Sequence, residues 1–214
     1  MSKPGGPALQ AQDILKILVL VSGNGTNLQA LIDAEKAGRF GRGRISLVIS
    51  DREDAYALTR ARNAGIRSLA ETPGPKLPGP ERREALSGRI LAQARAEGAG
   101  LIILAGFLSI LQGDILEAYR NRIINIHPSL LPKYGGKGMY GERVHKAVLA
   151  AGEKESGCTV HLVDEGTDTG PILLQRRVPV LEGDDSESLA VRIHNEEHQA
   201  IVEAAVMMIE RLTH

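Results

Sequence analysis

Short apolar runs alternate with segments of helical periodicity along the first 127 residues of the chain. A continuous apolar run bounded by turn residues is typical of a strand that is buried on both faces of a parallel sheet. Such runs predict strands at 16–22, 45–50, 66–69, 101–105 and 122–127. Apolar positions three and four residues apart, often followed by a glycine that ends the helix, predict helices at 28–37, 55–64, 81–97 and 113–119.

The pattern changes after Pro128. A glycine-rich loop at 133–141 precedes a predicted helix at 142–151, two strands at 158–163 and 172–180 that could form a long hairpin, and a terminal helix at 186–212. The alternation of strands and helices predicts an α/β fold: a single Rossmann-like domain with a mainly parallel, twisted sheet, right-handed crossovers and helices on both faces. We expect this domain to span 14–214, after a loose N-terminal tail at 1–13.

Composition limits the kinds of partner that the chain can bind. The 26 Lys and Arg residues balance the 26 Asp and Glu residues, and aromatic residues make up only 3%, so a nucleic-acid partner is not expected. The longest apolar run, 101–111, is too short to span a bilayer, and the start of the chain lacks a signal-peptide core. Cys158 has no second cysteine to pair with. We therefore expect a cytoplasmic monomer or homodimer that acts on small molecules, away from membranes.

The first candidate site is the turn Ser22-Gly23-Asn24-Gly25-Thr26-Asn27, between the first strand and the first helix. Glycines allow the backbone to approach a ligand, and amides at a helix N-terminus favour a phosphate. The turn is also half of a dinucleotide fingerprint, and Asp51 after the second strand could bind a ribose, so a nicotinamide enzyme stays an alternative. In the plainest interpretation the turn binds nothing, and Asn27 only caps the helix.

The second candidate site is Asn125-Ile126-His127-Pro128, at the carboxyl end of a predicted strand. Strand alternation places Asn125 and His127 on one face, at the edge where open α/β sheets bind ligands. An amide donor beside an imidazole suits acyl transfer, because one can stabilise an oxyanion while the other handles protons. The alternative is a histidine that merely satisfies its hydrogen bonds at the end of a strand.

The third candidate site is the acidic loop 164–171, Asp-Glu-Gly-Thr-Asp-Thr-Gly-Pro. A calcium loop of the EF-hand kind is disfavoured, because the ligand spacing and the terminal Glu are absent. A catalytic role would require one of its acids to orient His127, as an acid orients the base of a catalytic triad. A solvated turn is the alternative.

The terminal helix carries a carboxylate on an apolar stripe. Ile193, Glu197 and Ile201 are four residues apart, so Glu197 should be buried, where an unpaired charge is costly. Its partner could be a ligand amine or an arginine in a buried salt bridge. His194 and His198 have the spacing of a metal pair, but they lie off the stripe and the H-E-x-x-H order is absent, so no metal is expected.

Four segments, in this order, resemble the glycinamide ribonucleotide formyltransferase family: S-G-N-G-T-N-L-Q-A, L-A-G-F-L-x-I-L, N-I-H-P-S-L-L-P-K and D-E-G-T-D-T-G-P-I. The third is specific to folate-dependent formyltransferases as a class, whereas the first loop and the length point to the glycinamide branch. The resemblance implies that a formyl group moves from 10-formyltetrahydrofolate to the amine of phosphoribosylglycinamide, a step of purine synthesis that requires no metal.

The resemblance also implies roles for individual residues. Asp168 is preferred to Asp164 as the catalytic acid because it is nearer the glycine–proline end of its loop. The segment 134–141 departs from the family in being longer than its usual Pro-Gly stretch. The implied catalytic residues are Asn125, His127 and Asp168; the substrate ligands are Gly25, Thr26 and Asn27 for the phosphate and Glu197 for the glycinamide; the folate contacts are Arg83, Leu108, Ser109, Ile110, Leu111, Asn125, Asp164 and Asp168.

Three rival functions remain at this stage. A methionyl-tRNA formyltransferase shares the central motif, but that family carries an extra C-terminal domain for which this chain has no room, and the chain lacks basic excess. A nicotinamide-dependent oxidoreductase would explain the first turn and Asp51 but not N-I-H-P-S-L-L-P. A non-catalytic nucleotide-binding module would need neither Asn125 nor His127.

Overall fold

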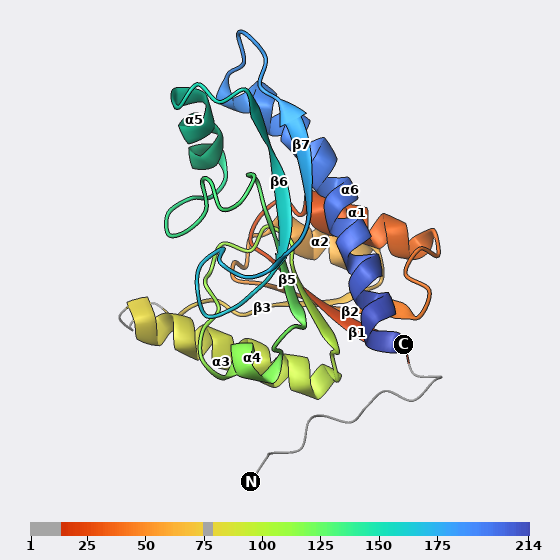
Figure 1. Ribbon diagram of the computed structural model, residues 1–214. Coiled ribbons are helices and arrows are strands. Elements are labelled where there is room, and N and C mark those ends of the chain that lie inside the picture. The colour runs from red at the N-terminus through yellow and green to blue at the C-terminus, as the bar shows by residue number, and fades with distance from the viewer. Residues whose placement is uncertain (1–13, 75–78) are drawn as a thin grey trace.

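The computed structural model describes residues 14–74 and 79–214, so the tail predicted at 1–13 lies outside the described residues. Figure 1 shows a central sheet with helices on both sides. The elements are, in chain order, β1 Leu15–Val21, α1 Thr26–Lys36, β2 Gly43–Ser50, α2 Tyr56–Asn63, β3 Arg67–Ala70, α3 Gly79–Glu97, β4 Leu101–Leu104, α4 Asp114–Ala118, β5 Ile123–His127, α5 Glu142–Ala150, β6 Glu155–Leu162, β7 Ile172–Pro179 and α6 Ser186–Thr213.

The seven-stranded sheet has the order β3-β2-β1-β4-β5-β6-β7. Strands β1 to β5 pair in parallel, whereas β6 pairs antiparallel with β5 and with β7. The predicted α/β class with a mainly parallel sheet is therefore confirmed, and the two late strands do form an antiparallel pair. Strand β6 begins three residues earlier than predicted, at Glu155, because its polar start pairs with β7 although it carries no apolar signal.

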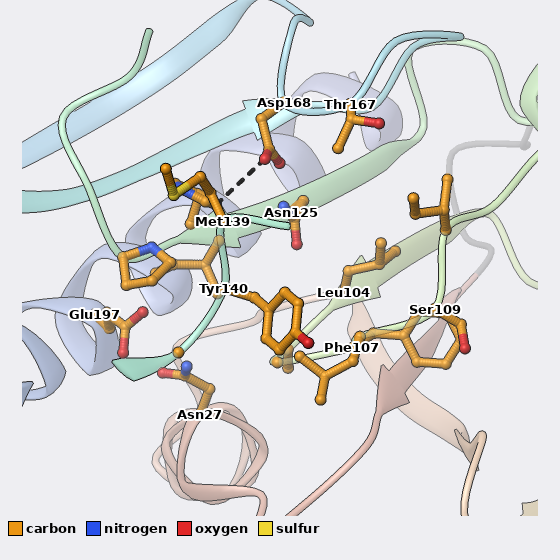
Figure 2. Close-up of a pocket in the computed structure, with 18 of the residues that line it drawn as sticks. Asn27, Leu104, Phe107, Ser109, Asn125, Met139, Tyr140, Thr167, Asp168 and Glu197 are labelled. Atoms are coloured by element: carbon orange, nitrogen blue, oxygen red, sulfur yellow. Dashed lines mark ion pairs between the residues drawn. The ribbon is translucent and has the colours of Figure 1, made fainter. Parts of the chain in front are cut away.

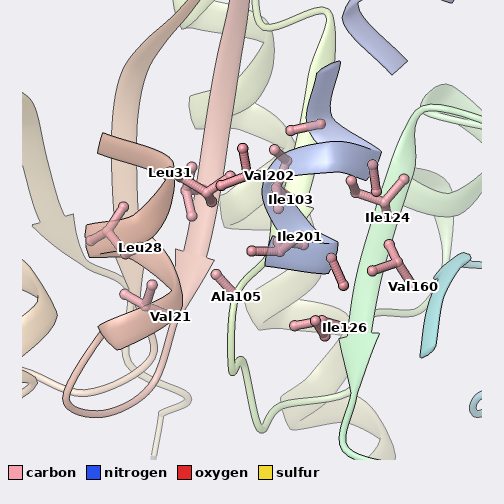
Figure 3. Close-up of a cluster of buried hydrophobic side chains, with 14 of the residues drawn as sticks. Val21, Leu28, Leu31, Ile103, Ala105, Ile124, Ile126, Val160, Ile201 and Val202 are labelled. Atoms are coloured by element: carbon pink, nitrogen blue, oxygen red, sulfur yellow. The ribbon is translucent and has the colours of Figure 1, made fainter. Parts of the chain in front are cut away.

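Strand alternation divides the core into two layers. Ile17, Val19 and Val21 of β1 join the cluster under α1, α2 and α6, while Leu18 and Leu20 join the cluster under α3 and α4. Figure 3 shows the first cluster, in which β1, β4, β5, α1 and α6 all meet. Full burial of one such aliphatic side chain contributes roughly 1.5–3 kcal/mol, so two apolar layers explain why these strands read as unbroken hydrophobic runs.

The strand order creates a place for a ligand. From β1 the chain proceeds to β2 and β3 on one side, whereas from β4 it proceeds to β5 on the other side. The loops after β1 and β4 therefore leave the sheet in opposite directions, and open α/β sheets bind ligands at such a point. Helix α6 packs against α1, β6 and β7, which brings the middle of a distant helix to the same end of the sheet (Figure 1).

Candidate active site

A cavity of about 490 Å³ lies at the carboxyl ends of β1, β4 and β5. Figure 2 shows that side chains from segments far apart in the sequence point into it. The structure thus joins the three motif segments and the terminal helix in one site. The lining residues are 23–27, 104–111, 125–128, 136–141 and 166–168, together with His145, His161, Val163, His194 and Glu197.

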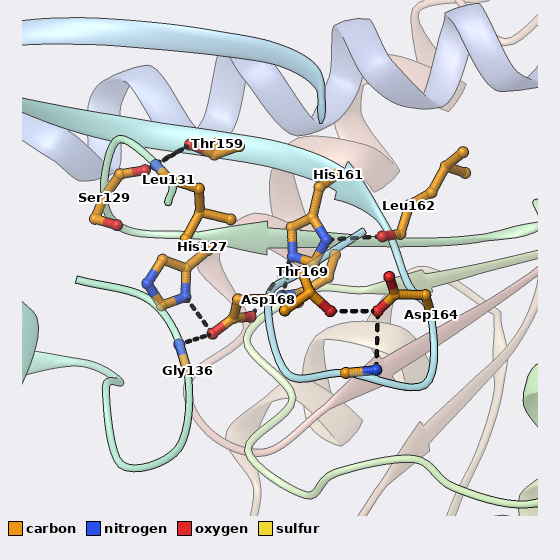
Figure 4. Close-up of polar contacts among 12 residues, drawn as sticks. His127, Ser129, Leu131, Gly136, Thr159, His161, Leu162, Asp164, Asp168 and Thr169 are labelled. Carbon is orange, nitrogen blue, oxygen red and sulfur yellow. Dashed lines mark hydrogen bonds and ion pairs between the residues drawn. The ribbon is translucent and has the colours of Figure 1, made fainter. Parts of the chain in front are cut away.

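His127 stands between two oxygen acceptors. It is only 4% exposed, and its Nε2 atom lies 2.8 Å from the carbonyl oxygen of Tyr134. Because a carbonyl only accepts, Nε2 carries a hydrogen and donates it to Tyr134. The other ring nitrogen, Nδ1, lies 3.5 Å from Oδ2 of Asp168 (Figure 4). In the neutral ring Nδ1 is therefore the nitrogen with a free lone pair.

The two aspartates of the acidic loop do different things. Asp168 adopts a left-handed backbone conformation, with φ of 60°, and its Oδ2 accepts a 2.9 Å hydrogen bond from the Gly136 amide. Asp164 instead accepts bonds from the Gly166 amide and the Thr169 hydroxyl, and so it builds the turn itself. Asp168 lines the cavity and Asp164 does not. The structure thus places Asp168, rather than Asp164, beside His127.

His161 on β6 is a site residue that the sequence analysis missed. Its Nδ1 lies 2.8 Å from the Leu162 carbonyl, and its Nε2 lies 3.1 Å from Nδ2 of Asn125 and 3.6 Å from Oδ1 of Asp168. In the neutral ring Nε2 accepts from Asn125, and in the protonated ring it can donate to Asp168. His161 therefore orients both the amide and the acid. The only signal was the β5–β6 register, which pairs Asn125 with His161 and which an apolar pattern does not reveal.

Burial strongly affects the protonation of His127 and Asp168. A carboxylate beside an imidazole raises the pKa of the imidazole, whereas burial lowers it. Here burial lowers the pKa of His127 more than Asp168 and the Tyr134 carbonyl raise it. Burial would raise the pKa of Asp168; the surrounding groups, chiefly His161, His127 and the Gly136 amide, outweigh it and hold that pKa below its usual range. The resting site thus combines a charged carboxylate with a neutral His127 at neutral pH.

The turn after β1 is shaped by packing as well as by any ligand. Gly25 has φ of 76°, and a Cβ atom on it would lie 2.6 Å from the Cβ of Ala57 on α2. Arg60, also on α2, donates from Nε to the Asn24 carbonyl at 2.8 Å. No side chain caps the N-terminus of α1, so the interpretation of Asn27 as the cap is wrong. Asn27 is buried, and its side chain reaches Glu197 instead.

Glu197 is buried as predicted, with 4% of its surface exposed. Its neighbours are the Asn27 side chain, which is hydrogen-bonded to it, and Nε2 of His194 at 3.6 Å (Figure 2 shows Asn27 facing it). Burial raises the pKa of Glu197 to about 7, although the Asn27 bond acts the other way. The alternative of a buried salt bridge with an arginine is wrong for the described residues: among them the ion-pair partner of Glu197 is His194, and Arg176 pairs with Glu196 and Glu203.

The opposite side of the cavity is formed by the loop after β4. All four residues expected to meet the folate from this loop, Leu108 to Leu111, line the cavity. Arg83 on α3 and Asp164 are not among the lining residues, and their folate contacts stay predictions. Asp51 is buried outside the lining and accepts a hydrogen bond from Ser109, so it is not presented to a ribose.

Three further features could suggest other chemistry in the described residues: a metal site, a membrane-spanning helix and a reactive cysteine. Within 14–74 and 79–214 no group of three or more His, Cys, Asp or Glu side chains could hold a metal ion. None of the described helices combines the length and the apolarity needed to cross a membrane. Cys158 is fully buried, and burial raises the pKa of its thiol to about 12, so it is not a nucleophile.

Known proteins match this fold and these motifs. The family model for formyl transferase matches residues 15–205. A phosphoribosylglycinamide formyltransferase of Escherichia coli K12 is 38% identical over 184 residues, which cover 86% of this chain and 82% of that protein. A trifunctional purine biosynthetic protein adenosine-3 of Drosophila melanogaster is 45% identical over 195 residues, which are 91% of this chain but only 14% of that relative's length.

A solved structure is also similar to this chain in fold and in sequence. Glycinamide ribonucleotide transformylase 1 from Symbiobacterium toebii superimposes with a TM-score of 0.84 at 45% identity, covering 92% of this chain and 89% of that chain. The match extends over the strands, the loops of the cavity and most of α6. This chain belongs to the formyl transferase family.

Proposed function

We propose that this protein transfers a formyl group from 10-formyltetrahydrofolate to the amine of phosphoribosylglycinamide, giving formylglycinamide ribonucleotide and tetrahydrofolate in purine synthesis. The observation that carries the proposal is a single cavity that connects Asn125, His127 and Asp168 with the turn 23–27 and Glu197. The relatives named phosphoribosylglycinamide formyltransferase support it. The partners are these small molecules, and the protein acts as a monomer or homodimer in the cytoplasm.

The acceptor substrate fits the side of the cavity formed by α1 and α6. The uncapped start of α1 offers the backbone amides of Gly25, Thr26 and Asn27 to a phosphate. Glu197 lies across from this turn and can accept hydrogen bonds from the glycinamide nitrogens. The same buried carboxylate would be costly without such a partner, which is why we assign it to substrate binding.

The co-substrate fits the other side of the cavity. The lining from Leu104 to Leu111 combines apolar side chains with exposed loop backbone, which suits a flat heteroaromatic ring with polar edges. When bound there, the folate supplies the formyl carbon that the amine attacks. Leu108, Ser109, Ile110 and Leu111 would hold its ring from one side, and the loop ending at Asp168 would hold it from the other.

The trio lies between the two sides. Attack forms the new N–C bond and places negative charge on the formyl oxygen, to which Nδ2 of Asn125 can donate a hydrogen bond. The attacking amine must lose a proton, and Nδ1 of neutral His127, which has the free lone pair, is the atom that would accept it. His127 then holds at Nδ1 the proton that the leaving nitrogen needs when its C–N bond breaks.

The surroundings of His127 favour this transient charge. As an imidazolium, His127 would have an N–H facing the Tyr134 carbonyl and another facing the Asp168 carboxylate, so both of its hydrogens meet acceptors. These acceptors are in place before the reaction, and they stabilise a charge that burial disfavours in the resting state. In this mechanism the positive ring would also stabilise the oxygen that becomes negative.

The test is a formyl-transfer assay with three acceptors. We expect tetrahydrofolate and formylglycinamide ribonucleotide to appear together with phosphoribosylglycinamide, and not with methionyl-tRNA or with water alone. A His127→Ala variant should still bind both substrates but lose transfer. Release of formate without an acceptor would show a hydrolase instead, and formylation of methionyl-tRNA would show the rival transferase.

A further inference from the structure

The loop after β4 is held almost entirely by side chains. Between Gly106 and Gln112 the described structure contains no backbone–backbone hydrogen bond. Two of the loop's amides donate instead to serine hydroxyls on other elements: Leu108 to Ser22 at 2.8 Å and Gln112 to Ser87 at 3.0 Å. The remaining backbone amides and carbonyls of the loop make no backbone hydrogen bond among the described residues, so the shape of the loop depends on these side-chain bonds.

A third tether leads to Asp51, directly after β2. The Ser109 hydroxyl donates to Oδ2 of Asp51 at 2.6 Å, a distance typical of a hydrogen bond to a charged oxygen. Ser109 lines the cavity, on the opposite side from Glu197 in Figure 2, whereas Asp51 does not line it. Among the described residues, the hydrogen bond from Ser109 therefore connects Asp51 to the cavity.

A role in stability alone does not explain a buried carboxylate at position 51. It is 8% exposed, and its second oxygen, Oδ1, is buried without a hydrogen-bond partner among the described residues. A buried carboxylate with an unsatisfied oxygen destabilises the fold relative to a smaller or apolar residue. The one side-chain hydrogen bond that Asp51 makes within 14–74 and 79–214 goes to the loop that lines the proposed co-substrate side of the cavity.

We infer that Asp51 is a positioning residue, which acts through Ser109 to hold the β4–α4 loop in the shape that binds the folate ring. The inference rests on the proposed function, because it assigns this loop to the co-substrate. It gives a structural role to an acid that would otherwise suggest a ribose-binding site. It also predicts that Asp51 affects one substrate and not the other, since the phosphate turn has its own anchor in Arg60.

The experiment compares Asp51→Ala, Ser109→Ala and the double variant. Each single change should weaken the binding of tetrahydrofolate about tenfold, because one charged hydrogen bond is lost. The double variant should be no worse than the worse single variant, because both changes break the same contact. The KM for phosphoribosylglycinamide should stay at the wild-type value. Asp54→Ala, an exposed aspartate three residues along the chain, is the matched control.

Several results would overturn the inference. These are unchanged folate affinity in folded Ser109→Ala, additive losses in the double variant, or equal losses for both substrates. Hydrogen–deuterium exchange across 106–112 gives a separate readout, which should speed up in Ser109→Ala and not in Asp54→Ala. If the wild-type protein fails to bind tetrahydrofolate, the proposed function fails, and exchange alone still decides whether Asp51 and Ser109 order the loop.

Discussion

Nε2 of His161 lies 3.6 Å from Oδ1 of Asp168, on the far side of the carboxylate from His127. One carboxylate thus faces two imidazoles, one with each oxygen. The Gly136 amide donates to Oδ2 of Asp168 at 2.9 Å and keeps this oxygen directed at Nδ1 of His127, while a protonated His161 can hold the other oxygen. The geometry thus adds His161 to the three residues that we propose to be catalytic, Asn125, His127 and Asp168.

Replacing His161 should therefore disturb catalysis without removing a reacting group. We expect His161→Leu to lower kcat by about 10- to 100-fold, the range for loss of an outer-shell orienting partner. The KM for each substrate should change little, since the proposed binding regions at 23–27 and 104–111 are untouched. Steady-state kinetics on both substrates would check this. A wild-type kcat in a folded variant would show that His161 does not orient Asn125 and Asp168 for catalysis.

Asp168 and Asp164 can be compared directly. Asp168→Asn keeps the volume but removes the charge beside His127, so it should lower kcat more than it changes folate affinity. Asp164→Asn should do much less, because that side chain only closes its own turn. The double variant His127→Ala with Asp168→Asn should be little worse than the worse single variant. Additive losses, or a larger effect at Asp164, would show that Asp168 is not the acid that acts with His127.

Glu197 predicts an unusual pH dependence of stability. The pKa of Glu197 is raised from 4.5 to about 7 in the folded protein. The protonated side chain therefore makes its full contribution to the free energy of unfolding below pH 4.5, and this contribution is lost as pH rises to 7. The loss is on the order of 3 kcal/mol. Glu197→Gln cannot ionise and should gain stability relative to the wild type between pH 5 and pH 8. Urea unfolding at both pH values would measure this.

The same variant tests the role of Glu197 in binding. If the carboxylate meets the substrate, Glu197→Gln should raise the KM for phosphoribosylglycinamide even while stability at pH 8 improves. Opposite signs for affinity and stability are the expected result. A variant that loses stability at pH 8 and keeps its affinity would contradict both the pKa and the assignment.

Gly25 and Gly23 should respond differently to substitution. Gly25→Ala forces a strained φ and a clash with Ala57 of α2, and should destabilise the protein by roughly 1–3 kcal/mol. Gly23→Ala meets open space and should leave the thermal midpoint nearly unchanged. Thermal unfolding compares the two. Loss of substrate binding in a Gly25 variant is informative only if the variant is folded, whereas Gly23→Ala tests the phosphate turn without that complication.

The strands β1, β4 and β5 could be predicted because each is buried on both faces, and period-two alternation then placed Asn125 and His127 together. The choice of Asp168 came from a family resemblance, because nothing in the local pattern distinguishes it from Asp164. The contact between Asn125 and His161 could not be predicted, since it depends on the register of two antiparallel strands.

The orientation of Asn27 and the pKa of His127 could not be predicted either, because tertiary packing sets both. The Asn27 side chain reaches a helix that lies far along the chain, so its orientation is set by tertiary packing and not by the local capping pattern. The pKa of His127 depends on how deeply the strand end is buried, and the sequence indicates the neighbouring charge but not the depth. Properties set by contacts between distant segments are the ones that required the structure.

The single, fully buried Cys158 makes the protein convenient for labelling. A thiol whose pKa is raised to about 12 is almost wholly protonated at neutral pH and is shielded from maleimides and iodoacetamides. A cysteine introduced at an exposed position such as Lys137 would then be the only reactive thiol, and the native cysteine need not be removed. A fluorophore there would report from the glycine-rich rim of the cavity as each substrate arrives.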